Sequence, residues 1–234
     1  KYPRLSFFCV RGNHEARPED VEGMEKVFML DIGNYVYMEL DYPNIYYLID
    51  GHEYMFDTYR TLVCGGAYSV DKYWRLEKQA AGFYGGWFAN EQLTQEERNI
   101  ISQLADGQSY DLILAHTCPY EWMPRDLFLR CVDQSTVDNS MELWLGELLQ
   151  QCSWGVFLCG HYHDDRILAP HAEMLSLGIK NLFNRILGFQ PVVEVRNSFD
   201  PQAIQTLDTR VDFKGVDIAF TSAGGDTSKE YAET

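Results

Sequence analysis

Apolar residues in the chain fall into short runs and stripes, and these patterns predict a mixed α/β fold. Leu5–Val10, residues 112–115 and Gly155–Cys159 are continuous apolar runs of the kind that a sheet covered on both faces buries. Each run passes directly into a polar loop that contains histidine. Since chemistry in α/β sheets collects beyond the carboxyl ends of the strands, the three loops are the first candidates for a functional site.

Helical periodicity appears in two further segments. Thr94 and Glu97 form a capping-box pattern ahead of an apolar stripe that ends near Ala105, and residues 141–152 repeat apolar positions at i, i+3, i+4 and i+7. Acidic residues close behind a proline favour a third helix over Pro18–Leu30. Short strands are expected at Ile45–Ile49, Glu53–Phe56 and Thr61–Cys64, with Asp50-Gly51 as a tight hairpin turn.

The pattern weakens after Asp165. Glu173–Gly188 is compatible with a helix, Val192–Val195 and Val216–Thr221 with strands, and Gly224–Thr234 with a polar tail. We therefore expect one domain over residues 1–170, followed by a C-terminal extension over residues 171–234 that completes the second sheet or ends as a polar tail.

The amino-acid composition restricts the partners and the cellular location that the protein can have. A net charge of −16 argues against a basic groove that binds nucleic acid. The six cysteines form no CxxC pair and mostly end apolar runs, which is typical of buried free thiols in a reducing compartment. No apolar stretch approaches the roughly 20 residues of a membrane span. The sequence predicts a soluble, cytoplasmic protein.

The candidate chemistry lies in the three histidine loops, which read Gly12-Asn13-His14-Glu15, Ala115-His116-Thr117 and Gly160-His161-Tyr162-His163. Imidazole nitrogen and, more weakly, an amide oxygen are ligands suited to divalent Mn, Fe, Co, Ni or Zn. His52 and His171 stand alone in the sequence, and an ordinary surface or hydrogen-bonded role is the better interpretation for both.

The ordered set of Gly-Asn-His-Glu, a strand-end histidine and Gly-His-x-His resembles the second half of the calcineurin-like metallophosphoesterase signature. Arg11 ahead of the first motif is similar to the Arg-Gly-Asn-His-Glu of serine/threonine phosphoprotein phosphatases. The stretch Gly65–Lys72 resembles bacterial and phage members of the same superfamily. Lys72 and Arg75, at and after its end, either add positive charge for a phosphate or belong to an exposed charged loop.

The resemblance implies a four-layer α/β/β/α sandwich with two divalent metal ions, and hydrolysis of phosphate esters by a metal-bound hydroxide. Carried over by position, Asn13, His116 and His161 would bind one metal and His163 the other. His14 would stabilise the transition state or protonate the leaving oxygen. Arg11 would bind the phosphate.

The family also carries Asp-x-His and Gly-Asp-x-x-Asp motifs upstream of Gly-Asn-His-Glu, and neither occurs in the eleven residues before Gly12. The sequence therefore predicts an N-terminally truncated domain that holds one metal or none. We also expect the missing segment to leave an exposed sheet edge that promotes self-association.

Three functions remain open at this point. The first is hydrolysis of a phosphomonoester, either a phosphoprotein or a small molecule. The second is hydrolysis of a phosphodiester or a dinucleoside polyphosphate, which the same metal pair supports. The third is a non-catalytic remnant that binds metal weakly or serves as an interaction domain.

Overall fold

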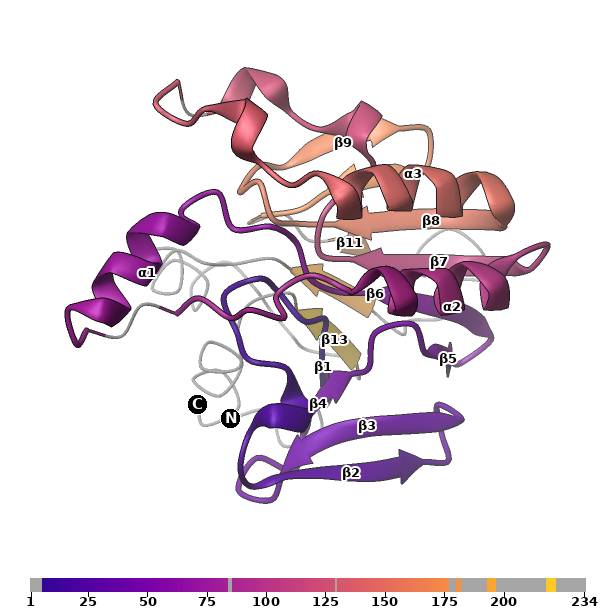
Figure 1. The fold of residues 1–234 in the computed structure, drawn as a ribbon. Coiled ribbons are helices and arrows are strands. Elements are labelled where there is room, and N and C mark those ends of the chain that lie inside the picture. Colours follow the sequence, from indigo (N-terminus) through magenta and orange to yellow (C-terminus); the bar gives the residue numbers. More distant parts are fainter. Residues whose placement is uncertain are drawn as a thin grey trace.

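A computed structural model of the chain describes residues 6–83, 86–128, 130–176, 180–181, 193–196 and 218–221. These residues form two mixed β-sheets, with helices packed on one face of the smaller sheet (Figure 1). The mixed α/β class predicted from the sequence is therefore confirmed. The second helical layer of the expected four-layer sandwich is not among the described residues.

Within the described residues the larger sheet has seven strands, and the first of these along the chain is central. Their order is β11 (Lys180–Asn181), β12 (Val193–Arg196), β13 (Ile218–Thr221), β1 (Ser6–Cys9), β4 (Ile45–Leu48), β3 (Asn34–Glu39) and β2 (Met24–Met29). Strand β1 runs parallel to both of its neighbours, β13 and β4. Because β1 is paired on both sides, it is not the exposed sheet edge that the sequence predicts. Self-association through a sheet edge would have to involve an outer strand of one of the described sheets.

The smaller sheet has six strands. Their order is β5 (Glu53–Phe56), β6 (Tyr59–Cys64), β7 (Ser109–Ala115), β8 (Ser153–Cys159), β10 (Ala172–Met174) and β9 (Arg166–Ala169). The four inner strands are parallel, and β5 and β9 pair antiparallel at the two edges. Strands β1, β7 and β8 thus all end in loops, but the first belongs to a different sheet from the other two.

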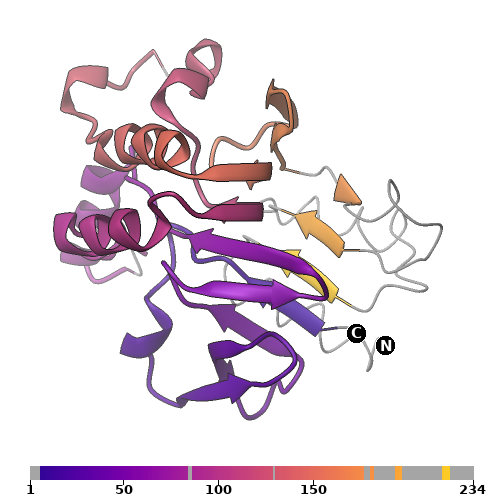
Figure 2. The same ribbon diagram turned by 90° about the vertical axis from the view of Figure 1, so that its right-hand side faces the viewer.

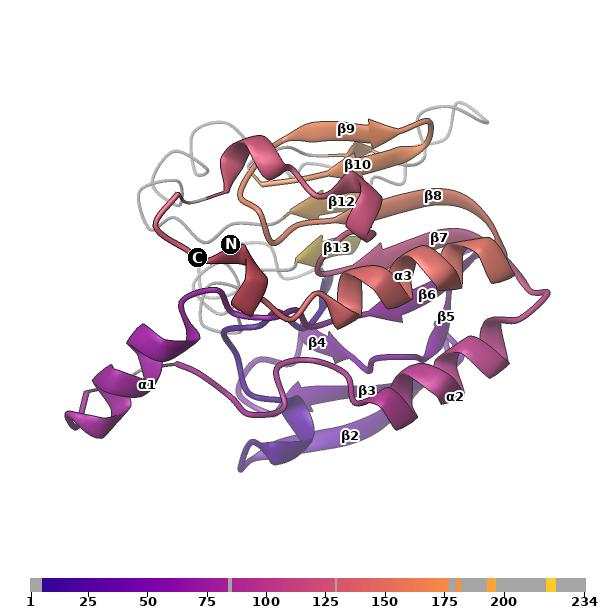
Figure 3. The same ribbon diagram turned by 45° about the horizontal axis from the view of Figure 1, so that its top comes forward.

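Two long helices cover the smaller sheet, as the periodicity predicts. Helix α2 (Gln95–Ala105) begins with the expected capping box between Thr94 and Glu97, and α3 (Ser140–Gln151) lies beside it (Figure 3). A third helix, α1 (Lys72–Ala80), buries none of its residues. Short 3-10 helices occur at Pro18–Asp20, Tyr120–Trp122, Arg125–Leu127 and Gln134–Thr136.

Strand β7 shows how the chain builds two cores from one apolar run. Successive side chains of a strand point to opposite faces. Leu112 and Leu114 join the core that also contains Phe8 of β1, whereas Ile113 joins the core under α2 and α3. Figure 2 shows these helices on one side of the molecule and β12 and β13 on the other. The smaller sheet is therefore buried on both faces, which explains its continuous apolar strands.

The helix predicted over Pro18–Leu30 is wrong. Only a single 3-10 turn forms at its start, and Met24–Met29 is strand β2, which pairs in full register with β3. Gly33 closes this hairpin with a backbone φ of 72°. The cross-strand pairing outweighs the helix-favouring charges near the proline, which act only over the first turn.

Two other expectations also need correction. Asp50-Gly51 does not close a hairpin, because β4 lies in the larger sheet and β5 in the smaller one, so the turn is a crossover between sheets. In Glu173–Gly188, residues up to Met174 belong to β10 and Lys180–Asn181 is β11, which excludes a continuous helix. The remainder of that segment and the predicted polar tail lie outside the described residues.

All six cysteines are free, and Cys9, Cys64, Cys118 and Cys159 are buried. Within the described ranges, no helix has both the length and the apolar character needed to cross a membrane.

Candidate metal centre

The three histidine loops meet although their strands come from two sheets. The amide of His116 donates to the carbonyl oxygen of Cys64 at 3.1 Å, and that of Gly160 donates to the carbonyl oxygen of His116 at 2.9 Å. Gly12 lies against the same histidine, since a Cβ added to it would come within 3.2 Å of the His116 ring. A side chain at the position ahead of Asn13 would push the His116 ring by a few tenths of an ångström, so a glycine there favours the close approach of the two loops.

Three of the predicted ligands bring their donor atoms together. Asn13 Oδ1 lies 2.9 Å from His116 Nε2, and His161 Nδ1 lies 3.3 Å from the same nitrogen. Two nitrogens bound tetrahedrally to an ion at about 2.0–2.1 Å are about 3.3–3.4 Å apart. Neighbouring ligands of an octahedral ion at the same bond length are about 2.9 Å apart. The 3.3 Å separation therefore matches tetrahedral ligands and the 2.9 Å separation matches octahedral ones, so both lie in the range found between ligands of a divalent ion.

The protonation of the two histidines also suits metal binding. Desolvation and the neighbouring imidazole of His161 hold the pKa of His116 well below its usual value. Desolvation, with His14 and His163 nearby, lowers the pKa of His161 to about 3. Both rings are therefore neutral near pH 7, and a neutral imidazole is the form that binds a metal.

The Gly-His-x-His loop is held in an unusual backbone conformation. His161 and His163 have φ values of 71° and 56°, in the left-handed region, which is uncommon for residues other than glycine although asparagine, aspartate and histidine are enriched there. Such a conformation costs on the order of 1–3 kcal/mol per residue and is found mainly where surrounding structure or function imposes it. Here it directs the Nδ1 atom of His161 toward His116.

The amide of Asn13 is oriented by two buried residues that the sequence reasoning missed as site residues. Asn13 Nδ2 donates to Ser69 Oγ at 2.9 Å, and Ser69 Oγ donates to Glu91 Oε2 at 2.5 Å. Because the nitrogen of the amide faces Ser69, its oxygen faces His116. The available signal was the resemblance of Gly65–Lys72, which contains Ser69, to other family members.

His14 lies beside the three donors rather than among them. Its Nε2 atom is 3.5 Å from Asn13 Nδ2 and accepts a hydrogen bond from Arg75 Nη2 at 3.2 Å. Arg75 in turn donates to Asp71 at 2.8 Å. Desolvation, followed by the charge of Arg75, lowers the pKa of His14 to about 4. Of Lys72 and Arg75, the two cations that the sequence suggests for a phosphate, Arg75 is thus the one that contacts His14.

Arg11, to which the resemblance assigns the phosphate, is buried and makes its contacts within the protein. Its Nε atom donates to Asp50 Oδ2 at 2.7 Å, its Nη1 atom donates to the carbonyl oxygen of Glu91 at 2.7 Å, and only 4% of its surface is exposed. It is not among the described residues that line the cavity next to the histidines. These contacts fasten the first loop to the crossover between the sheets.

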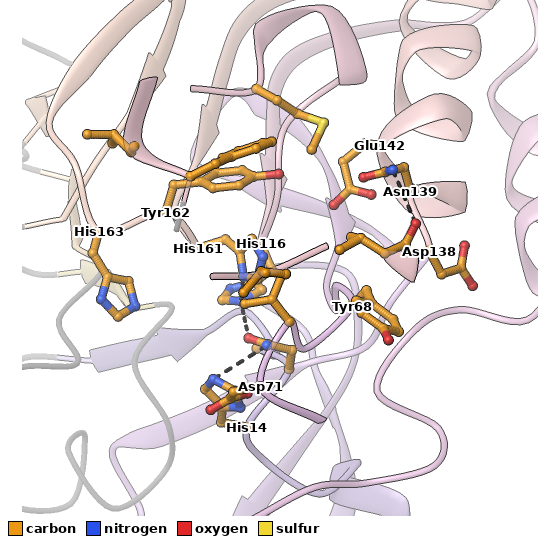
Figure 4. Close-up of a pocket in the computed structure, with 18 of the residues that line it drawn as sticks. His14, Tyr68, Asp71, His116, Asp138, Asn139, Glu142, His161, Tyr162 and His163 are labelled. Atoms are coloured by element: carbon orange, nitrogen blue, oxygen red, sulfur yellow. Dashed lines mark hydrogen bonds between the residues drawn. The ribbon is translucent and has the colours of Figure 1, made fainter. Parts of the chain in front are cut away.

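His163 is exposed, and Figure 4 shows its ring to one side of the His116–His161 pair. It lines the same cavity as His14 and His161. Across the described ranges, no three histidine, cysteine or acidic side chains are grouped as a metal site. The set that converges consists of two histidines and an asparagine, which are all neutral ligands.

Comparison with protein-family models, with curated proteins and with solved structures finds no match to this chain. Function must therefore be argued from the site itself.

Proposed function

We propose that the chain is a metal-dependent phosphate-ester hydrolase of the metallophosphoesterase type. The observation that carries this proposal is the convergence of Asn13 Oδ1, His116 Nε2 and His161 Nδ1 at separations that suit a divalent metal. The four-layer sandwich belongs to the same proposal, and the two stacked sheets with one helical layer support it. A bound divalent metal would lower the pKa of a water molecule and neutralise phosphate oxygens.

The side chains around these donors have distinct parts in the proposed reaction. His14 is the group placed to supply a proton to the leaving oxygen. Its ring is neutral in the free site, and the negative charge of a bound phosphate favours its protonated form. Arg75, which donates to His14 but, like Arg11, is not among the described residues that line the cavity, is the cation that we assign to the phosphate oxygens. Ser69 and Glu91 orient Asn13, and Arg11 anchors the loop that carries it.

A second candidate is a protein that binds metal without catalysis. It is favoured by one observation, namely that the converging donors include no carboxylate to bridge two ions. The two functions predict the same metal binding and differ only in turnover.

Hydrolysis of 4-nitrophenyl phosphate and of bis(4-nitrophenyl) phosphate with Mn²⁺ tests the proposal and separates monoesters from diesters. We expect turnover of the monoester that depends on the metal and falls by about 10²–10⁴-fold in His14→Asn, the range typical of a lost general acid or base. Metal binding without any turnover would support the non-catalytic alternative. Turnover that His14→Asn leaves unchanged would contradict the part assigned to His14.

A further inference from the structure

The cavity beside the candidate metal ligands is much larger than a phosphate group. It has a volume of about 410 Å³ and extends from His14 and His161 to the segment that links β7 with α3. That volume is within the range of about 300–1,000 Å³ found for small-molecule sites. Apolar side chains from the linking segment line the far part of the cavity, and these are Met123, Leu127, Phe128, Val132 and Val137.

Aromatic rings form part of the wall close to the histidines. Phe128 and Tyr162 stack with their ring centroids 6.2 Å apart and an angle of 19° between their planes. Figure 4 shows Tyr162 on one side of the cavity and Tyr68 and Glu142 on the other, with His116 and His161 between them. Flat aromatic walls favour a ligand that itself carries an apolar ring.

Charge restricts the ligand further. Four acidic residues line the cavity, and neither lysine nor arginine occurs among the described lining residues; the acids are Glu15, Asp71, Asp138 and Glu142. Like charges close together in a site of low dielectric repel each other strongly. Figure 4 shows Asp71 beside His14 and Asp138 and Glu142 on the opposite side. The negative charge away from His14 therefore comes from Asp138 and from the ionised form of Glu142, and this part of the cavity disfavours a further anionic group.

Glu142 lines the cavity and has one side-chain oxygen that lacks a hydrogen-bond partner within the described chain. Its side chain comes from α3, it is 3% exposed, and its Oε1 atom accepts a hydrogen bond from Thr117 Oγ1 at 2.9 Å. Its Oε2 atom is buried without a partner within the described chain. A buried polar atom without a partner is costly, so a ligand that supplies a donor there gains affinity. Desolvation raises the pKa of this carboxyl group to about 7.

We infer that this cavity is the subsite for the alcohol half of the substrate, an inference that rests on the proposed phosphoesterase function. The preferred alcohol is uncharged, carries an apolar ring between the aromatic walls, and directs an N–H or O–H donor at Glu142. Polyphosphate substrates, which would place further anionic groups among acidic side chains, are disfavoured. The subsite thus favours simple esters over dinucleoside polyphosphates.

Four matched phosphomonoesters test the subsite: methyl, benzyl, 4-(hydroxymethyl)benzyl and 4-carboxybenzyl phosphate. We expect kcat/KM for the benzyl ester to exceed that for the methyl ester by about tenfold, with a further gain for the hydroxymethyl ester and a loss of similar size for the carboxy ester. Phe128→Ala should remove the preference for benzyl over methyl. Phe28→Ala, which truncates a half-exposed phenylalanine on β2, is the matched control and should retain it.

Glu142→Gln provides the sharper variant because it keeps the shape of the side chain. With its oxygen held by Thr117, the new amide would turn an N–H group toward the cavity. The gain for the hydroxymethyl ester should then be lost, and a 4-cyanobenzyl ester, which carries an acceptor, should become the better substrate. A variant that lowers kcat/KM equally for every ester would overturn the role given to Glu142.

The outcomes separate this inference from the proposed function. Equal kcat/KM for benzyl and methyl phosphate would refute the subsite while leaving the hydrolase intact. With no hydrolysis of any ester, binding of 1,4-benzenedimethanol, followed by protein NMR, tests the subsite alone. Binding that Phe128→Ala weakens supports it, and absence of binding by the wild-type chain refutes it.

Discussion

Ser69 tests whether the orientation of the Asn13 amide matters to the proposed metal site. Ser69→Ala removes the acceptor of Asn13 Nδ2 and a donor to Glu91, in surroundings where Ser69 and Glu91 are 1% and 3% exposed. A buried polar group left without its partner costs about 1–3 kcal/mol, so the free energy of unfolding should fall by that amount. Metal affinity should fall by about 10–100-fold, as is typical when a residue that orients a ligand is lost.

The measurements are urea unfolding without metal and competitive titration of Mn²⁺ or Zn²⁺ against a chelating dye. Ser102→Ala is the matched control, because Ser102 Oγ on α2 also accepts a hydrogen bond at 2.9 Å, from Trp144 Nε1. Because Ser102 is only half-buried, this variant should lose less stability than Ser69→Ala, and it should keep its metal affinity. If the two variants bind metal equally well, the orientation argument is refuted.

Three further predictions concern the loops around the site. Burial lowers the pKa of His161 from 6.5 to about 3. Below pH 6.5 the unfolded chain therefore binds a proton that the folded chain does not, and the free energy of unfolding decreases as the pH is lowered. His161→Asn, which tolerates the left-handed backbone, should flatten this slope in urea unfolding measured from pH 7 to pH 4. Asp50→Asn turns an amide toward the buried guanidinium of Arg11 and should lower the free energy of unfolding by about 3–5 kcal/mol; an unchanged urea midpoint would show that the ion pair contributes little. Gly66 and Gly107 both have a positive φ, but a Cβ added at Gly66 would clash with a backbone carbonyl oxygen whereas one added at Gly107 would meet open space. Gly66→Ala should therefore destabilise the chain far more than Gly107→Ala. Similar melting temperatures for the two variants would contradict this.

The elements that the sequence predicts correctly are those with a strong local signal. The capping box of Thr94 and Glu97 and the apolar stripe of α3 depend on residues within a few turns of each other. The failure over Pro18–Leu30 has the opposite origin. Strand β2 exists because it pairs with β3, and its sequence, in which two adjacent charged residues precede three apolar ones, lacks the alternation that would indicate a strand.

The candidate site could be predicted from the sequence to about the same extent as the fold. Asn13, His116 and His161 follow apolar strands, so their convergence agrees with a rule about strand ends. The partners of Arg11 could not be read from the sequence, since Asp50 and Glu91 are 39 and 80 residues away along the chain. Ser69 and Glu142 were equally hidden, because a buried hydroxyl or carboxyl group has no characteristic pattern in a single sequence.

The most direct test of the metal site is the absorption spectrum of the chain titrated with Co²⁺, compared with His161→Asn and His52→Asn. His52 serves as the control because its Nδ1 atom lies 3.2 Å from Asn34 Oδ1, outside the donors discussed above. We predict a visible band that saturates with Co²⁺ in the wild type and in His52→Asn and is lost in His161→Asn. No saturable band in the wild type, or the same band in all three proteins, would contradict the site formed by Asn13, His116 and His161.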